Sequence, residues 1–254
     1  MSNNSPEGLI LKLGPTLNSQ ILYLFGANHS NNPNDSQFTQ LQQLWNEFLS
    51  VVDNDKIVFT EGAIREVPTN YEEAIRQRGE VGATQWLAKK SEILAIYPEP
   101  DESEQRKKLC SIFDPQTVAY ALITQNLAAW FRQTTHQSDF TEATERSVKR
   151  EARFAEIFGF TPSTSWLHDQ HKKLFGNQRL EDQDFLDKIS DPRKNDTPIN
   201  AIVAGRTKIR NEYIHNCIVE IWKSGKNIFM VYGKGHFVVL EPILKKMVTD
   251  KPID

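Results

Sequence analysis

The sequence predicts an α/β fold with a mixed or mostly parallel central sheet, flanked by helices and carrying a large helical insertion. Short, continuously apolar runs alternate with helical segments at both ends of the chain, whereas residues 102–190 have a mostly helical pattern. The 254 residues are enough for one large domain with a real hydrophobic core. We therefore predict a single α/β domain, 1–254, with a helical subdomain inserted at about 102–198 and one sheet formed by the flanking portions.

The first elements are predicted to be a β-hairpin and an amphipathic helix. The segment 8–26, "GLILKLGPTLNSQILYLFG", holds two apolar runs separated by Gly-Pro and Asn-Ser turn signals. The second run, 21–25, is apolar throughout, which is typical of a strand covered on both faces. A helix is predicted to begin near Asp35 or Ser36, because either side chain can cap it. Its expected apolar stripe is Phe38, Leu41, Leu44, Trp45, Phe48, Leu49 and Val52.

The rest of the chain continues the same alternation around the helical insert. Asp114 followed by Pro115 is a strong helix start, because aspartate caps well and proline suits the first helical position. The other predicted elements are a strand 57–60, a helix 71–91 interrupted at Gly79 and Gly82, an apolar run 93–97, a polar loop 190–198, a helix from about 200 to 224, a strand 228–232 and a last helix containing Pro242.

Composition limits the classes of partner and compartment. The formal net charge is −3 and no basic stripe occurs, so we expect neither a nucleic acid nor a membrane surface as a partner. Cys110 and Cys217 are the only cysteines and lie far apart, which predicts no disulfide framework and a reducing compartment. The chain shows no secretory signal and no apolar run of roughly 20 residues. The expected location is therefore cytoplasmic, and the oligomeric state is left open.

Polar or titratable residues follow each predicted strand. His29 comes after the run 21–25, Glu61 after 57–60, Glu99 after 93–97 and His236 after 228–232. In an open α/β sheet, ligands bind in the crevice outside the carboxyl ends of the strands. If these strands are parallel, two histidines and two carboxylates meet at one edge of the sheet.

Those residue types suit hydrolytic chemistry. A neutral imidazole can serve as a metal ligand or a general base, and two imidazoles plus a carboxylate suit a divalent metal that keeps a position open for water. The predicted metal ligands are His29, Glu61 and His236, while Glu61 or Glu99 is the alternative base toward the water. The substrate or an oxyanion is expected to contact the turn residues and one helix residue, Gly26, Asn28, Gly233, Lys234, Gly235 and Asn211.

Arg210 on the long helix before the last strand is a further candidate, because a guanidinium orients a carboxylate or stabilises developing negative charge. Each signal alone also has a structural reading. Gly-Lys-Gly also fits a plain turn, Glu61 fits a helix cap, and Glu99 fits a solvated position in a proline-rich turn. It is their joint occurrence after successive strands that favours a site.

The motifs resemble the superfamily that groups TraB and Tiki proteins with ChaN-like haem-binding proteins and erythromycin esterases. The similar segments are "GANH" at 26–29, "FTEG" around Glu61 and "GKGH" at 233–236, and the helix with Arg210 and Asn211 resembles the arginine-bearing helix of TraB-type members. The first motif reads "GANH" where ChaN and the esterases typically have Gly-Glu-x-His.

The resemblance implies an α/β fold with one of three activities. Tiki-type members imply a metal-dependent peptidase built on the two histidines and the glutamate, and esterase-type members imply a histidine base without an obligate metal. ChaN-like members imply a non-catalytic protein that binds haem, a metal or a small anion. The primary expectation is a metal-assisted hydrolase that cleaves an amide, peptide or ester bond in a small-molecule or peptide substrate, and the haem-binding protein is the alternative.

Overall fold

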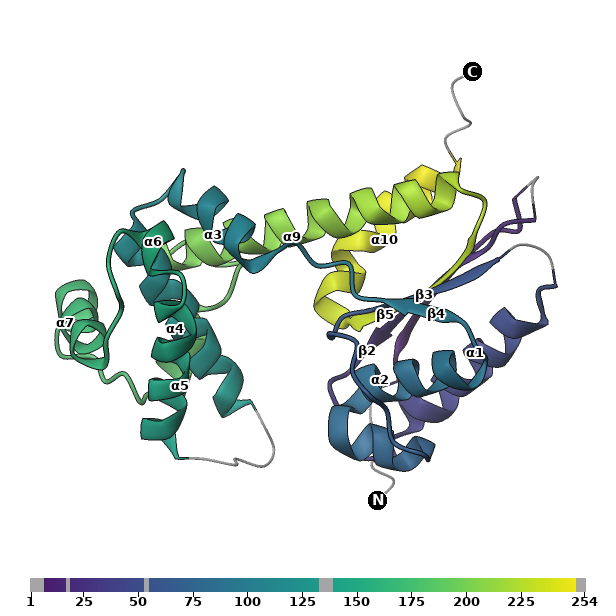
Figure 1. Ribbon diagram of the computed structural model, residues 1–254, viewed down its shortest axis with the longest axis horizontal. Helices are drawn as coiled ribbons and strands as arrows, with labels where there is room; N and C mark the ends of the chain where they lie inside the picture. Colours follow the sequence, from purple (N-terminus) through teal and green to yellow (C-terminus); the bar gives the residue numbers. More distant parts are fainter. Residues whose placement is uncertain (1–6, 17–18, 53–54, 133–138, 250–254) are drawn as a thin grey trace. The chain divides into compact units, whose positions relative to one another are not determined.

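The computed structural model of the chain describes residues 7–16, 19–52, 55–132 and 139–249. Its secondary structure is α/β, as the sequence predicts: a five-stranded sheet is combined with helices, and the strand order is β1-β2-β5-β3-β4 (Figure 1). Strands β2, β5, β3 and β4 run parallel, while β1 pairs antiparallel with β2. The hairpin prediction is correct, although Asn18 of its turn lies outside the described residues.

The strands and helices lie close to their predicted positions. The strands are β1 (Leu9–Leu13), β2 (Leu22–Ala27), β3 (Lys56–Thr60), β4 (Leu94–Ile96) and β5 (Asn227–Gly233). The helices are α1 (Ser36–Ser50), α2 (Tyr71–Lys90), α3 (Glu102–Cys110), α4 (Pro115–Phe131), α5 (Phe140–Ala152), α6 (Ala155–Phe158), α7 (Thr164–Phe175), α8 (Gln183–Ile189), α9 (Pro198–Lys223) and α10 (Lys234–Thr249).

The chain divides into two compact units. The first unit comprises residues 1–99 and 211–254 and contains the whole sheet, and the second comprises residues 100–210 and is helical. The boundary between Arg210 and Asn211 falls inside α9, so the helical insertion extends beyond the expected 198. Within the described residues, no helix is both long and apolar enough to cross a membrane.

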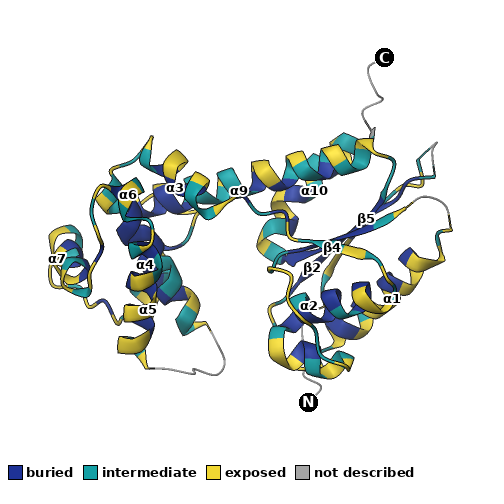
Figure 2. Cartoon of the chain, in the orientation of Figure 1, coloured by how far each residue is buried: buried dark blue, intermediate teal, exposed yellow. Residues whose placement is uncertain are grey.

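Helices cover both faces of the sheet in the first unit. On one face, α1 and α2 pack against β2, β3 and β5, with Trp45 and Phe48 of α1 in ring contact with Phe229 of β5. On the other face, Ile214 and Ile218 of α9 join α10 against the same strands. Figure 2 shows β2 and β5 coloured mostly as buried, between these layers. Burial on both faces explains why β2 and β5 are continuously apolar.

Helix α1 begins where the sequence predicts and ends earlier. The Asp35 side chain accepts a hydrogen bond from the Gln37 backbone N–H and caps the helix. The backbone turns extended at Val51, so the predicted apolar stripe does not reach Val52, which is 90% exposed. Leu49 is 38% exposed as well, and the prediction is wrong for both residues. The buried stripe runs from Phe38 to Phe48.

Helix α2 is interrupted where its glycines predict. Arg78 and Gly79 have non-helical backbone angles, and the φ of Gly79 is +56°. That left-handed angle favours glycine, because a side chain at positive φ is strained. A Cβ at Gly79 would also lie 2.7 Å from the Ser30 carbonyl oxygen. The kink therefore brings α2 close to the loop that follows β2.

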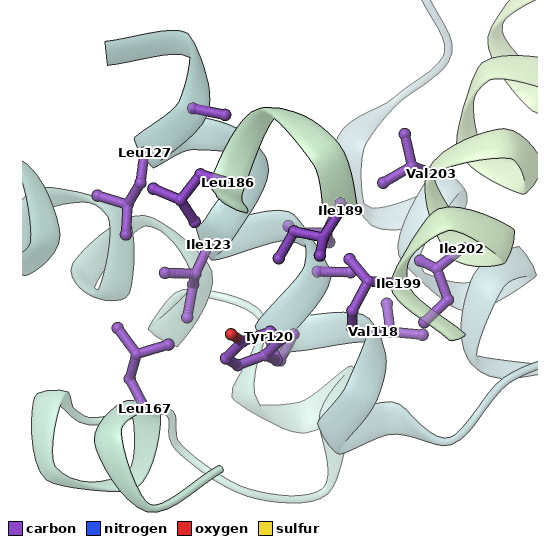
Figure 3. Packing of buried hydrophobic residues seen from close by; sticks show 14 of the residues in the cluster. Val118, Tyr120, Ile123, Leu127, Leu167, Leu186, Ile189, Ile199, Ile202 and Val203 are labelled. Atoms are coloured by element: carbon purple, nitrogen blue, oxygen red, sulfur yellow. The ribbon is translucent and has the colours of Figure 1, made fainter. Parts of the chain in front are cut away.

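The second unit has its own hydrophobic core, built from α4 and the helices around it (Figure 3). Asp114 and Pro115 start α4 as predicted, with the Asp114 carboxylate accepting from the Thr117 N–H. Inside this core, the Tyr120 hydroxyl lies 2.6 Å from His171 Nδ1. The other ring nitrogen of His171 lies 2.7 Å from the Gln178 carbonyl oxygen. His171 is thus a buried, hydrogen-bonded core residue.

A buried ion pair joins α3 to α5 within the second unit. The Arg106 guanidinium donates to both carboxylate oxygens of Glu151, at 2.8 and 2.7 Å. The side chains of both residues are at most 5% exposed. Arg106 also lies over the Phe154 ring, 3.8 Å from its centroid. Two charges removed from water in this way stabilise the fold only as a pair.

Candidate functional site at the carboxyl edge of the sheet

The parallel strands bring three of the predicted site residues to one edge of the sheet. Ala27 at the end of β2 pairs with Gly233 at the end of β5, and Thr60 at the end of β3 pairs with Val231. His29 lies two residues after β2, Glu61 directly follows β3, and His236 lies in the first turn of α10 after β5. All three residues belong to the first unit.

Glu61 lies at the centre of this site. One carboxylate oxygen accepts a 2.6 Å hydrogen bond from the Gly233 backbone N–H, and the other lies 3.5 Å from His236 Nε2. Burial alone raises the pKa of Glu61, but hydrogen bonding and charge at His236, the Gly233 N–H and the charge of His29 together lower it from 4.5 to about 2. Glu61 is therefore an ionised carboxylate at neutral pH.

His236 is oriented from its other side by a helix of the same unit. Its Nδ1 lies 2.9 Å from Asn211 Oδ1. Because an amide oxygen only accepts hydrogen bonds, Nδ1 carries the proton and Nε2 faces Glu61. Asn211 is buried, with 8% exposure. The side-chain oxygen of Asn211 thus positions His236, whereas the sequence suggested a contact with substrate.

His29 is held by a carboxylate on the kinked helix α2. Its Nδ1 lies 2.5 Å from Glu80 Oε1, and Glu80 is almost fully buried. The His29 side chain itself is 72% exposed. A carboxylate acceptor on Nδ1 keeps the proton of the neutral imidazole on that nitrogen. His29 is therefore an exposed imidazole that is oriented by a buried carboxylate.

Gly233 brings His29 and Glu61 together. A Cβ at this position would lie 2.8 Å from His29 Nε2 and 3.2 Å from Glu61 Oε2, so a larger residue would displace the imidazole. By contrast, a Cβ at Gly235 would meet nothing within 4 Å. The glycine at 233 is therefore required by close approach of the two side chains.

Most of the residues that were predicted to bind an anion make other contacts in the structure. The Gly233 N–H already donates to Glu61, so it is not a free donor for an oxyanion. A Cβ at Gly26 would lie 2.9 Å from the Phe237 side chain, so this glycine makes room for α10. Lys234 Nζ donates to the Glu7 carbonyl oxygen at 2.8 Å, and Gly235 is exposed. The prediction of a backbone oxyanion cradle is wrong at Gly233.

Asn28 is engaged through its backbone. Its N–H donates to Gln37 Oε1 and its carbonyl oxygen accepts from Gln37 Nε2, at 2.9 and 2.8 Å. Gln37 is fully buried in the first turn of α1. This pair of hydrogen bonds fixes the loop that carries His29.

The other two predicted site residues, Glu99 and Arg210, stay predictions. Glu99 follows β4, the edge strand, which is separated from β5 by β3. Arg210 is the last residue of the second unit and directly precedes Asn211 on α9. Within the first unit, the contacts bring together His29, Glu61, His236 and Asn211.

Two residues of the site were missed by the sequence reasoning. Glu80 lies within the "RGEVG" interruption of α2, and a carboxylate between two glycines at a helix break is the signal that could have identified it. Gln37 looked like an ordinary polar residue in the first turn of a helix, and no sequence signal marks it. Both contacts depend on how α1 and α2 pack on the sheet.

The three predicted metal ligands are two imidazoles and a carboxylate. In both imidazoles, Nδ1 faces an oxygen acceptor, as is usual for a histidine that binds a metal through its other nitrogen. The Glu61 carboxylate is ionised. However, among the residues that the structure describes, no three His, Cys, Asp or Glu side chains are grouped so that they could hold a metal ion. The chemistry of the site is therefore derived from the side chains alone.

The fold and the site together define an α/β protein with a two-histidine, two-carboxylate centre at the carboxyl edge of its sheet. Comparison with known proteins found no match among family models, curated proteins or solved structures. The resemblance to the TraB, Tiki, ChaN-like and erythromycin esterase superfamily stays a prediction.

The low pKa of Glu61 predicts a pH-dependent contribution to stability. The folded-state pKa of about 2 lies below the unfolded value of 4.5, so ionised Glu61 stabilises the fold above about pH 4.5, and the effect is lost as the pH falls toward 2. We expect Glu61→Gln to reduce the free energy of unfolding by on the order of 3 kcal/mol at pH 6, and by much less at pH 3.

Urea denaturation of both proteins at the two pH values measures this difference. Glu66→Gln, at an exposed residue of the same loop, is the control and should stay within about 0.5 kcal/mol of wild type. A Glu61→Gln deficit that is equal at pH 3 and pH 6 contradicts the assignment.

Proposed function

We propose that the protein is a hydrolase that cleaves an ester or amide bond at the carboxyl edge of its sheet. His29 acts as the general base, Glu80 as its positioning residue, and the Glu61–His236 pair as the acid component. The substrate is a small molecule or peptide. The reducing setting indicated by the free Cys110 and Cys217 makes the cytoplasm the proposed location.

The single observation that carries this proposal is the Glu80–His29 contact beside the Glu61 carboxylate. A buried carboxylate on Nδ1 stabilises the imidazolium that forms when Nε2 takes a proton. The side chain is 72% exposed, so water and a substrate can approach the ring. Such an arrangement favours base catalysis over passive packing.

In the proposed reaction, His29 Nε2 removes a proton from water and the resulting hydroxide attacks the carbonyl carbon. A tetrahedral intermediate forms and then collapses with cleavage of the bond to the leaving group. His236, when protonated, is paired with Glu61 and supplies the proton that the leaving group takes up. One water is consumed, and the protons on the two histidines re-equilibrate through solvent.

A divalent metal is a proposed cofactor; the residues that would hold it are His29, Glu61 and His236, whose side chains would first have to move into a metal-binding geometry. When bound, it would supply Lewis-acid polarisation of the water or carbonyl. Haem binding is the alternative function, for which Tyr23 and Tyr97 are the candidate ligands. Tyr23 packs against Phe48, which favours a structural role.

The purified protein should hydrolyse at least part of a panel of 4-nitrophenyl esters and peptide amides. The panel is run on untreated protein, on chelator-treated protein and after addition of divalent ions, and metal content is measured in parallel. A double variant, His29→Ala with His236→Ala, is the blank and should show no turnover.

Absence of turnover under all three conditions, or equal turnover by the double variant, contradicts the proposal. A haem absorption spectrum in the untreated protein favours the alternative. Activity that survives chelation supports the side-chain mechanism, and activity restored only by an added ion adds the metal to it.

A further inference from the structure

Two arginines lie beside the candidate site. Arg65 is in the loop that follows Glu61, and Arg78 is at the kink of α2, two residues before Glu80. Arg78 is half-buried and Arg65 is exposed. Both arginines are therefore close along the chain to residues that carry the proposed chemistry.

Gln85 of α2 holds the two arginines near each other. Its side-chain oxygen accepts from Arg78 Nη1 at 2.8 Å and from the Arg65 backbone N–H at 3.3 Å. The same amide donates to the carbonyl oxygens of Gly62 and Ala63, each at 3.1 Å. Gln85 is only 3% exposed, so this connection between the loop and the helix is built into the core.

Arg78 is also fixed from the side of the loop. Its Nη2 donates to the Ala63 carbonyl oxygen at 2.7 Å, and a Cβ on Gly62 would lie 3.3 Å from the same nitrogen. The next residue, Gly79, packs on Ser30, and Glu80 holds His29. Arg78 therefore lies between the His29 loop and the Glu61 loop.

Neither guanidinium forms an ion pair with a carboxylate in the described part of the chain. Burial and the positive charge of Arg65 lower the pKa of Arg78. Two like charges that are held near each other repel. An anion bound between them would attract both guanidinium groups and so offset that repulsion. Hydrogen bonds to neutral acceptors alone leave the positive charge uncompensated.

We propose that Arg65 and Arg78 bind an anionic group of the substrate, a carboxylate or a phosphate. A guanidinium recognises either group through paired N–H donors. This inference rests on the proposed function, because the anion is taken to be part of the molecule hydrolysed at His29. The site would then select esters or amides that carry a negative charge near the scissile bond.

Two esters with the same leaving group test the preference. We expect wild type to have a higher kcat/KM for mono-(4-nitrophenyl) glutarate, which is anionic, than for neutral 4-nitrophenyl acetate. Arg78→Gln and Arg65→Gln should each lower the anionic-to-neutral ratio by about 10- to 100-fold, the range typical of a lost hydrogen bond to a charged group. Arg65→Gln tests the idea at an exposed position where folding is not at risk.

Arg76→Gln is the matched control, because Arg76 lies on the same helix but is exposed and pairs with Glu72 at 2.9 Å. Its ratio should equal that of wild type. A ratio that is unchanged in both Arg65→Gln and Arg78→Gln, or that falls equally in Arg76→Gln, overturns the inference.

A second readout does not depend on hydrolysis. Titration with inorganic phosphate should shift the backbone amide NMR signals of residues 62–65 in wild type and Arg76→Gln, and not in Arg65→Gln or Arg78→Gln. If neither ester is hydrolysed but these shifts occur, the proposed function fails and the anion site stands. If wild type shows no shift, or both arginine variants keep it, the anion site is overturned.

Discussion

Replacing His29 by asparagine is expected to lower kcat/KM by about 10²- to 10⁴-fold, the usual contribution of a general base. Asparagine retains a donor near the position of Nδ1 and so can still meet Glu80, which avoids leaving a buried carboxylate without its partner. It lacks a group equivalent to the basic Nε2. The loss should therefore appear in turnover and not in folding.

The measurement compares initial hydrolysis rates and urea denaturation midpoints of wild type and His29→Asn. His168→Asn, at an exposed histidine of the second unit, is the control and should match wild type in both. If His29→Asn keeps full activity, His29 is not the base. If activity and stability fall together, the residue is structural.

Replacing Glu151 by glutamine is expected to lower the free energy of unfolding by about 3–5 kcal/mol. The substitution keeps the shape of the side chain but leaves the buried Arg106 guanidinium with only the partly exposed Glu102 carboxylate, 3.8 Å away, as a counter-charge. Both side chains are at most 5% exposed, so solvent cannot compensate. The Phe154 ring under the guanidinium offsets only a small part of that loss.

Chemical denaturation followed by circular dichroism measures this loss. The control is Glu104→Gln, which removes an exposed pair with Lys107 at 2.8 Å on the same helix α3. Exposed pairs contribute little, so the control should change stability by less than about 1 kcal/mol. Equal effects of the two substitutions would show that the Arg106–Glu151 pair is not buried in solution.

Much of the fold was predictable because its signals are local. Strands β2 and β5 are continuously apolar since helices cover both faces of the sheet, and the Asp114–Pro115 pair marks the start of α4. The boundary of α1 was predicted less well. The apolar period continues through Leu49 and Val52, but Leu49 in the last turn is 38% exposed, and Val52 lies beyond the end of the helix at Ser50.

The candidate site was predictable only in part. His29, Glu61 and His236 follow parallel strands, so the topology alone brings them to one edge. The Glu80 contact joins residues 51 positions apart through a kink at Gly79, which periodicity does not report. Likewise, the Gly233 N–H was predicted to be free to bind an anion. The structure shows that this N–H donates a hydrogen bond to the Glu61 carboxylate.

The most direct test of the central claim is the imidazole NMR spectrum of wild type compared with Glu61→Gln. If both rings share Glu61, the Cε1–H signals of His29 and His236 move together and the signal of His168 stays in place. A Glu61→Gln spectrum in which only one of the two site histidines moves, or neither does, contradicts a shared site.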